Sequence, residues 1–389
     1  MSPAWRVGIA GVSAIGVGFG FARYGYGLFL PEIAREFGLP VSTAGWIASA
    51  GYAGYLLALV AAGALADRVG PRPLVVAGGL AAAVGMALVA VADGSATLVA
   101  GLVLAGTSSG WVWAPYSDAV DRLIPENRRS RVLALLPTGT AFGVVVAGAL
   151  AMAVQWRVAW GLFSLMALAV TAYNLAVIPG GAGRRSAGFG AAAGFSALRL
   201  YATALSYGLV GAVYWSFAVA AVSATGAAPV FWILTGLSGV AGLATGVLIH
   251  RWGLPGAHRV IFLALACAAG LLALAPGELT AVIASALLYG ASFMAGSGLL
   301  AVWSHRLFPE RPTAALSVAL VFLAIGTIAG PAVMGVLAAG SGLGTALWVT
   351  AAIAALTLLA GPVRDDSRTA TTLTGGEFSR GGHRDHLPH

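Results

Sequence analysis

The stretch Gly63-Ala-Leu-Ala-Asp67-Arg68-Val-Gly70-Pro-Arg72 is a short charged interruption between two long apolar segments, which cover residues 43–65 and 73–92. A helix that crosses a bilayer needs about 20 apolar residues, and both segments reach this length. Charged residues and a Gly-Pro pair between two such segments are typical of a connecting loop. We therefore predict a membrane-spanning helical hairpin with Gly63, Asp67, Arg68, Gly70 and Arg72 in its loop region.

The alternation of long apolar segments and short polar loops continues through the rest of the chain. Of its 389 residues, 59% are hydrophobic and only 9% are charged, and the mean hydropathy is +0.91. Soluble domains carry about 25% charged residues, so this composition excludes a single soluble domain, a disordered chain and a coiled coil. We predict an all-α polytopic membrane protein with 12 transmembrane helices. Their predicted ranges are 6–30, 43–65, 73–92, 96–117, 130–154, 157–178, 198–221, 229–250, 258–275, 279–303, 314–339 and 344–362.

The orientation of these helices follows from the basic residues, all 21 of which are arginine. With a cytoplasmic N-terminus, 18 of them fall in cytoplasmic segments, Arg35 and Arg157 fall outside, and Arg23 falls within the first helix. Cytoplasmic loops carry an excess of basic residues, so we predict a multi-pass protein of the cell membrane with both termini in the cytoplasm. The same excess accounts for the formal net charge of +8, and no nucleic-acid partner is expected.

The sequence also contains a degenerate internal repeat. A shift of 183 residues places Tyr24-Gly25 on Tyr207-Gly208, and it places segment 63–70 on segment 246–253 with identical Gly, Leu, Arg and Gly. A shift of 184 residues places segment 122–126 on segment 306–310, with identical Arg, Leu, Pro and Glu. Such a duplication predicts two pseudo-symmetric halves of six helices. We assign residues 1–179 to the N-terminal half, 180–197 to a cytoplasmic linker, 198–363 to the C-terminal half and 364–389 to a disordered cytoplasmic tail.

Together, the charged loop, the predicted helices and the duplicated halves resemble the major facilitator superfamily of transporters along almost the whole chain. Segment 63–72 is similar to the loop signature of that superfamily, and the segment Gly20-Phe-Ala-Arg23-Tyr-Gly-Tyr26-Gly-Leu-Phe-Leu-Pro31 resembles its YbfB/YjiJ-like branch. The resemblance implies the major facilitator fold and a secondary transporter that works by alternating access, with the residues of the charged loop as a cytoplasmic gate. It implies no catalytic residues, cofactor or metal, and a monomer whose partners are membrane lipid and a small-molecule substrate.

Two departures from the superfamily pattern bear on the kind of transport. The fourth helix usually carries an Arg four residues before a Gly, where this chain has Leu102 before Gly106. The fifth helix of antiporters usually contains a Gly-Pro pair, which is missing among Gly139, Gly143 and Gly148. Both departures disfavour a drug/proton antiporter, although efflux of multiple drugs or other hydrophobic compounds stays open as an alternative.

Arg23 is the one charged residue that we predict to lie within a span. It follows about 17 residues of the first helix, hence about 25 Å along it, and a charge at such depth usually faces a cavity and has a function. The guanidinium group suits a carboxylate or a phosphate. We therefore predict a small organic, anionic substrate that Arg23 anchors. The structural alternative is that Arg23 snorkels outward or pairs with Glu32 or Glu36.

Five further residues are candidates for substrate binding, because they are aromatic or polar groups at the depth of a cavity, and small-molecule sites are mostly apolar with a few directed polar groups. They are Tyr26, Trp113, Asn174, Tyr207 and Tyr289. The competing interpretation for each is packing or interfacial anchoring. No Asp or Glu is predicted well inside a span, so protons as coupling ion would need a boundary acid such as Glu32 or Asp118, or a proton carried by the substrate. A facilitator or an exchanger is equally consistent with the sequence.

Two serine patterns raise the alternative of an intramembrane enzyme. Gly106-Thr-Ser108-Ser-Gly110 fits the nucleophile-elbow pattern, but that pattern needs a strand-to-helix turn and here lies inside a span. Gly236-Leu-Ser238-Gly239 resembles the serine motif of rhomboid proteases, without a later intramembrane His. We interpret both as helix-packing segments and predict that the chain is not an enzyme.

Overall fold

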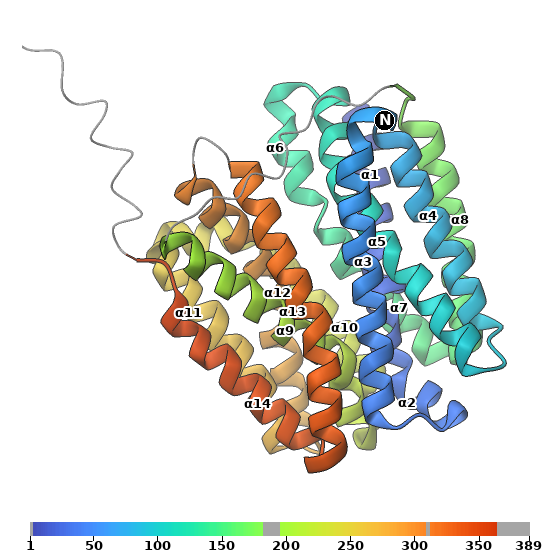
Figure 1. Ribbon diagram of the computed structural model, residues 1–389, viewed down its shortest axis with the longest axis vertical. Helices are drawn as coiled ribbons and strands as arrows, with labels where there is room; N and C mark the ends of the chain where they lie inside the picture. Colours follow the sequence, from blue (N-terminus) through green and yellow to red (C-terminus); the bar gives the residue numbers. More distant parts are fainter. Residues whose placement is uncertain (1–2, 182–194, 309–311, 364–389) are drawn as a thin grey trace, which may run out of the picture.

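The computed structural model describes residues 3–181, 195–308 and 312–363, and within these ranges it contains helices and loops but no strand. The helices fall into two groups that lie side by side in Figure 1. The N-terminal group is α1 (Pro3–Ile15), the π-helix η1 (Gly16–Arg23), α2 (Gly25–Phe37), α3 (Val41–Val69), α4 (Pro71–Ala90), α5 (Ser95–Leu123), α6 (Glu126–Leu135), α7 (Thr138–Ala153) and α8 (Trp156–Val177). The C-terminal group is α9 (Phe195–Val222), α10 (Ala228–Gly239), α11 (Thr245–Leu274), α12 (Leu279–Leu307), α13 (Pro312–Ser341) and α14 (Leu343–Leu356), with the short 3-10 helices η2 (Ser223–Thr225), η3 (Val240–Ala244) and η4 (Thr357–Ala360).

The number of membrane crossings agrees with the predicted twelve. Eleven segments of the described chain are long and apolar enough to span a bilayer, and one of them, Ala228–Leu274, has 47 residues. At 1.5 Å per residue this segment is about 70 Å long, roughly twice the hydrocarbon thickness of a bilayer. The helical path breaks inside it at Gly253, where φ is 70°. It therefore crosses twice, and the prediction of twelve helices in two six-helix halves is confirmed.

The helices are longer than the predicted apolar segments at several ends. The fourth crossing was predicted at 96–117, whereas α5 runs to Leu123 and carries Asp118 and Arg122 on its last turns. These two side chains form an ion pair at 2.8 Å, one helical turn apart. Charged residues are tolerated in a helix once it leaves the hydrocarbon region, so hydropathy marks the membrane boundary and not the end of the helix.

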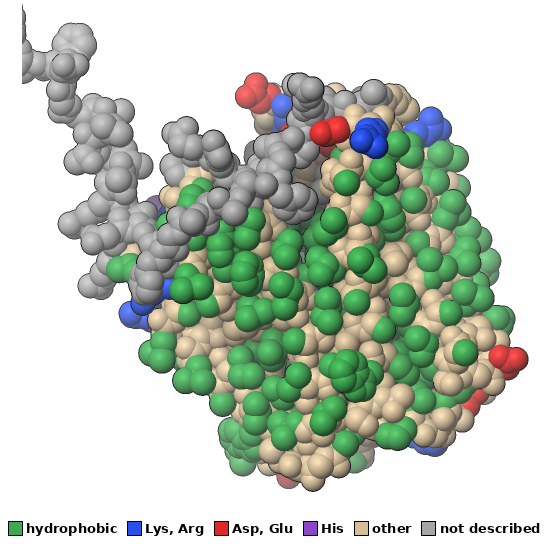
Figure 2. All heavy atoms as spheres, in the orientation of Figure 1, with side chains coloured by type: hydrophobic (Ala, Val, Ile, Leu, Met, Phe, Trp, Pro, Cys, Tyr) green, Lys and Arg blue, Asp and Glu red, His purple; other side chains and the backbone are tan. Residues whose placement is uncertain are grey.

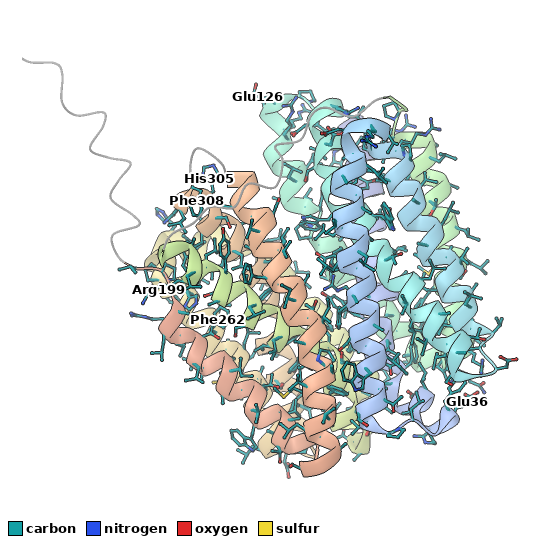
Figure 3. All side chains as sticks on the ribbon, in the orientation of Figure 1. Glu36, Glu126, Arg199, Phe262, His305 and Phe308 are labelled. Atoms are coloured by element: carbon teal, nitrogen blue, oxygen red, sulfur yellow. The ribbon has the colours of Figure 1, made fainter. Side chains whose placement is uncertain are left out.

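Charged side chains gather at the two ends of the molecule, whereas its flank is apolar. Figure 2 shows the flank covered by hydrophobic side chains and backbone, with the red and blue side chains toward the ends. Glu126 and Glu36 lie at opposite ends in Figure 3. We call these the α6 end and the α2 end, after the helices that lie there in Figure 1. The apolar flank between them is the surface that a bilayer requires.

Two glycines at matching positions of the internal repeat have the same unusual backbone geometry. Gly70 between α3 and α4 has φ 75° and ψ 179°, and Gly253, 183 residues later, has φ 70° and ψ 171°. Residues with a Cβ strongly avoid this region of conformational space. The two hairpins therefore turn in the same way, which gives the weak sequence repeat a structural counterpart.

The two halves meet most closely near the α2 end. A Cβ atom on Gly27 of α2 would lie 1.7 Å from the carbonyl oxygen of Trp215 in α9, and one on Gly45 of α3 would lie 2.2 Å from the carbonyl oxygen of Pro331 in α13. On Gly148, near the end of α7, a Cβ would lie 3.0 Å from the carbonyl oxygen of Pro229 at the start of α10. Gly45 and Gly148 lie in the parts of α3 and α7 nearest the α2 end, whereas Gly27 is the third residue of α2 and lies nearer the middle of the first crossing. Figure 1 shows the two groups of helices diverging toward the α6 end.

The predicted domain boundaries fall partly outside the described residues. The predicted tail, 364–389, and most of the predicted linker, 180–197, belong to ranges that the structure does not describe. The helix α9 begins at Phe195, inside the range predicted for the linker.

Candidate functional site

Arg23 lies at the end of the π-helix η1, midway along the first crossing. The turn closes with a hydrogen bond from the Tyr24 amide to the Phe19 carbonyl oxygen at 3.1 Å, and α2 begins at Gly25. Three glycines in this segment, at positions 16, 18 and 20, have low α-helix propensity. A π-helical segment within a helix often occurs at a functional site, because it changes the direction of the side chains that follow.

Arg23 contributes to a central cavity between the two halves, with a volume of about 120 Å³. From the N-terminal half the cavity is lined by Phe19, Arg23, Tyr24, Tyr52, Tyr55, Trp113, Pro137 and Thr140. From the C-terminal half it is lined by Tyr207, Gly208, Ala212, Trp215, Phe293, Met294, Ser297, Leu320, Leu323 and Thr327. Among these described lining residues Arg23 is the only charged one, and none is acidic.

Four aromatic rings surround the Arg23 guanidinium. Its Cζ lies 4.0 Å from the ring centroid of Tyr55, 4.9 Å from that of Tyr52, 5.4 Å from that of Phe19 and 5.8 Å from that of Tyr24. Contacts within about 6 Å stabilise a cation by about 0.5–2 kcal/mol each. The rings therefore hold the charge in place without neutralising it.

Within the described part of the chain, the Arg23 Nε is buried and has no hydrogen-bond partner. The two carboxylates that we considered as structural partners lie elsewhere. Glu36 pairs with Arg157 at 2.6 Å and accepts a hydrogen bond from Trp156 Nε1 at 2.9 Å, and Glu32 is exposed. The cavity thus holds a fixed cation with a free donor, an arrangement that suits an anion.

Three of the other predicted binding residues lie beside Arg23. Trp113 and Tyr207 line the central cavity, where the Tyr207 hydroxyl donates a hydrogen bond to the Phe293 carbonyl oxygen. Tyr26 lines a narrow space of about 20 Å³ that also touches Arg23, and its hydroxyl donates to the Ala44 carbonyl oxygen at 3.3 Å.

Two predicted binding residues do not line the central cavity. Asn174 lies between α8, α1 and α5, where its amide donates to the Ala10 carbonyl oxygen at 3.2 Å and its oxygen accepts from the Tyr116 hydroxyl. Tyr289 is buried, stacks on Tyr214 at 3.6 Å between ring centroids, and donates to the Gly211 carbonyl oxygen at 3.0 Å. The polar groups of each side chain form hydrogen bonds within its own half of the protein. This arrangement favours the packing interpretation for both residues.

The sequence analysis missed the tyrosines that hold Arg23. Tyr52 and Tyr55 are three residues apart in α3, so they lie on one face of the helix. That spacing in an otherwise apolar helix is the signal that could have found them. Tyr24 follows Arg23 directly, and Trp215 and Phe293 of the other half had no comparable signal.

The predicted gate lies at the junction of α3 and α4, at the α6 end. Asp67 and Arg68 belong to the last turn of α3, Gly70 is the turn residue, and Arg72 belongs to the first turn of α4. Arg72 Nε is buried without a hydrogen-bond partner among the described residues. Gly63 lies two turns earlier on α3. The loop is therefore at the end where the two halves diverge.

The serine of the rhomboid-like pattern has no catalytic neighbour among its described hydrogen-bond partners. Ser238 Oγ contacts the carbonyl oxygens of Thr235 at 3.1 Å and Ala286 at 3.2 Å. Ser108 lies inside α5, where its Oγ is buried without a described partner. The strand-to-helix turn that the nucleophile-elbow pattern needs does not occur at this position.

Comparison with known proteins gives one family match. A sequence model of the family described as "Uncharacterised MFS-type transporter YbfB" matches residues 15–361. No curated protein sequence matches the chain.

Solved transporters share the fold at low sequence identity. A bacterial homologue of the human lysosomal transporter Spinster, in an inward-facing and occupied conformation, has a TM-score of 0.73 and 15% identity over 92% of this chain and 96% of its own. A mutant of the nucleoside transporter NupG has a TM-score of 0.73 and 11% identity over 92% of this chain and 98% of its own. The human organic anion transporter MFSD10 (TETRAN) has a TM-score of 0.66 and 18% identity over 92% of this chain and 100% of its own.

Proposed function

The chain belongs to the YbfB family of major facilitator superfamily transporters, and we propose that it carries a small organic anion anchored by Arg23. Its family and fold show that the chain is a secondary transporter and a multi-pass membrane protein. The proposal concerns what this transporter carries, where the substrate binds and how the cavity changes its access.

The proposal of an anionic substrate rests on one observation, the isolated positive charge of Arg23 in the central cavity. A cationic substrate would meet this charge without any acidic group among the described lining residues to offset it. An anion, in contrast, would gain charge-assisted hydrogen bonds from the guanidinium group, whose Nε has no partner among the described residues. The aromatic walls accommodate the apolar part of the same molecule.

Alternating access explains the asymmetry between the two ends. Close packing of the halves at Gly27, Gly45 and Gly148 closes the cavity toward the α2 end. The excess of arginine predicts the α6 end to be cytoplasmic, so we assign this conformation as open toward the cytoplasm. The loop of Asp67, Arg68 and Arg72 would then act as the gate that closes this end when the halves rock.

The means of energy coupling follows from the absence of acids among the described lining residues. A proton relay in a transporter commonly uses an intramembrane carboxylate, and here only the substrate itself would bring one to the cavity. We infer either symport of a proton on the substrate's own carboxylate or passive exchange of anions. A monomer is sufficient for this mechanism, because both halves of the cavity come from one chain.

The second candidate function is transport of uncharged hydrophobic compounds, favoured by the number of aromatic rings in the cavity. The two functions differ in the role they give Arg23. If the substrate is uncharged, the rings of Tyr52 and Tyr55 would stabilise the Arg23 charge without any part for Arg23 in binding. Replacing Arg23 would then leave ligand binding unchanged. No catalytic role is proposed, since Ser238 donates to backbone carbonyls.

A ligand-stabilisation screen on the purified chain tests the proposal. Small aromatic and aliphatic carboxylates are compared with their neutral amides in the wild type, in Arg23→Gln and in Arg35→Gln. Arg35 is an exposed arginine on α2, so its replacement removes the same charge outside the cavity. Carboxylates should raise the melting temperature of the wild type and of Arg35→Gln, and should fail to raise that of Arg23→Gln. Equal shifts by carboxylates and amides would instead favour the hydrophobic-compound function.

A further inference from the structure

A second cavity, separate from the central one, lies within the C-terminal half where α9, α11, α12 and η4 meet. Its volume is about 810 Å³, and three arginines line it: Arg199 of α9, Arg259 of α11 and Arg306 of α12. None of the described lining residues is acidic. Figure 3 shows Arg199 beside the end of α14. A cluster of three positive charges in one concave site indicates a ligand with more than one negative oxygen.

Of these three arginines, Arg199 is held in position by a backbone carbonyl group. Arg199 Nη1 donates a hydrogen bond to the Gly361 carbonyl oxygen at 3.0 Å. Gly361 in turn lies against the ring of His258, because a Cβ atom on it would be 2.8 Å from His258 Nδ1. Arg199 and His258 are therefore joined through one backbone segment at the wall of the cavity.

His258 is the second, independent sign of a polar ligand. Its side chain lines the cavity and is completely buried, yet within the described residues neither ring nitrogen has a hydrogen-bond partner. Buried polar groups are nearly always hydrogen-bonded in folded proteins. The unpartnered nitrogens of His258, at the wall of a basic cavity, indicate that a ligand or ordered water completes them.

The backbone adds further donors at the same place. At Gly253 the helical path of α11 breaks, so a new helix starts at Leu254. The first amide groups of a helix have no partner within it and mark the positive end of its dipole. Gly253, Leu254 and Gly256 all line the cavity. Phosphate groups bind at such helix starts.

The rim of the cavity is apolar and faces outward. Trp252 is 50% exposed, Leu359 76% and Val363 45%, and all three line the cavity. Tryptophan is enriched where a membrane protein meets the head-group layer. A ligand with a charged head and an apolar body would match both the basic interior and this rim.

We propose that this basic pocket binds a phosphate group, and that its natural source is the head group of an anionic phospholipid. Basic pockets at the cytoplasmic side of membrane proteins are suited to such head groups. The three arginines neutralise the phosphate, His258 and the start of the second helix of α11 donate to its oxygens, and the acyl chains lie along Trp252 and Leu359. This site is independent of the central cavity and of the substrate carried there.

The test uses the full-length chain, purified in detergent and stripped of lipid. Binding of phosphatidylglycerol, phosphatidylcholine and inorganic phosphate is measured by native mass spectrometry and by the shift in melting temperature. The test variant is Arg259→Gln with Arg306→Gln, since both side chains are exposed and we expect their replacement to leave the fold intact. The control variant is Arg128→Gln with Arg251→Gln, which removes the same charge from exposed arginines that do not line the pocket.

Phosphatidylglycerol should bind the wild type and the control variant equally well, and the test variant roughly 30-fold more weakly, or about 2 kcal/mol for two basic residues. His258→Leu should raise the melting temperature of the lipid-free protein and reduce the shift that phosphatidylglycerol causes. Inorganic phosphate binding as tightly as the lipid, and lost in the same variant, would support the phosphate site but assign it a soluble source. Equal binding of phosphatidylglycerol by the test and control variants, or equal binding of phosphatidylcholine by the wild type, would overturn the proposal.

Discussion

Tyr24 of the N-terminal half stacks on Trp215 of the C-terminal half, with ring centroids 4.3 Å apart and ring planes 12° apart. Tyr24 is also the residue that follows Arg23 at the end of the π-helix. The same ring therefore contacts the charged group of the cavity and the opposite half of the protein. We therefore expect occupation of the cavity and closure of the α2 end to be coupled at this side chain.

Tyr24→Ala should weaken the closed α2 end. Stacked aromatic pairs are worth about 0.5–1.5 kcal/mol beyond their buried area, so the population with an open α2 end should rise several-fold. Spin labels on Arg35→Cys and Thr345→Cys, in a Cys267→Ser background, report the distance across this end. We expect a longer distance to gain population in Tyr24→Ala.

The control for this experiment is Tyr201→Ala. Tyr201 stacks on Phe322 at 5.1 Å between centroids, but both residues belong to the C-terminal half. Its loss should leave the distance distribution across the α2 end as in the wild type. Identical distributions in the wild type and Tyr24→Ala would contradict a sealing role for the Tyr24–Trp215 pair.

Gly27→Ala should prevent the halves from closing at the α2 end. The added Cβ would lie 1.7 Å from the Trp215 carbonyl oxygen, which is backbone and cannot move aside alone. We expect substrate uptake into proteoliposomes to fall at least tenfold, while the protein still folds. Gly161→Ala is the matched control, because nothing lies within 4 Å of that Cβ position on α8. Wild-type uptake by Gly27→Ala would show that this close approach is not needed.

Gly70→Ala and Gly253→Ala should destabilise the protein by similar amounts. Both glycines have a positive φ with an extended ψ, a conformation that costs a residue with a Cβ about 1–3 kcal/mol. Thermal unfolding of the purified variants measures the effect. Gly246→Ala, in the same repeated segment but in open helical surroundings, should be neutral or slightly stabilising. A large loss in only one of the two turn variants would argue against equivalent hairpins.

The orientation of the chain is tested by labelling from one side of the membrane. In a Cys267→Ser background, Glu126→Cys at the α6 end and Glu36→Cys at the α2 end are exposed to a membrane-impermeant maleimide in intact cells. The distribution of arginine predicts labelling at position 36 and protection at position 126. The opposite pattern would reverse the orientation and make the present conformation open to the outside.

The fold could be predicted from the sequence because each feature that determines it can be read from a short segment or from a count of residues. Hydropathy marks the spans, the arginines set the expected orientation, and the turn glycines Gly70 and Gly253 keep the repeat visible. The π-helix at Gly16–Arg23 could not be predicted in this way. Its Gly16 and Gly20 pack against Gly139 and Gly143 of α7, a contact that only the tertiary structure shows. The C-terminal end of α5 was also missed, since the helix continues where hydropathy stops.

The candidate site was predicted only in part. Arg23 stands out in the sequence because a single charge in an apolar segment is costly, whatever surrounds it. Asn174 and Tyr289 were chosen by residue type and depth, but each turns toward a partner within its own half. Which face of a helix meets the cavity is a property of tertiary packing. It cannot be read from the residues of a single helix in one sequence.

The most direct test of the account compares the affinities for one carboxylate and for its neutral amide, using the best ligand from the stabilisation screen. Calorimetry is carried out on the wild type, Arg23→Gln and Arg35→Gln. Loss of hydrogen bonds to a charged group costs about 1.5–3 kcal/mol, so Arg23→Gln should bind the carboxylate roughly 10- to 150-fold more weakly, with affinity for the amide unchanged. Arg35→Gln should match the wild type for both ligands. If Arg23→Gln binds the carboxylate as tightly as the wild type does, Arg23 is not the anion anchor and the central claim is wrong.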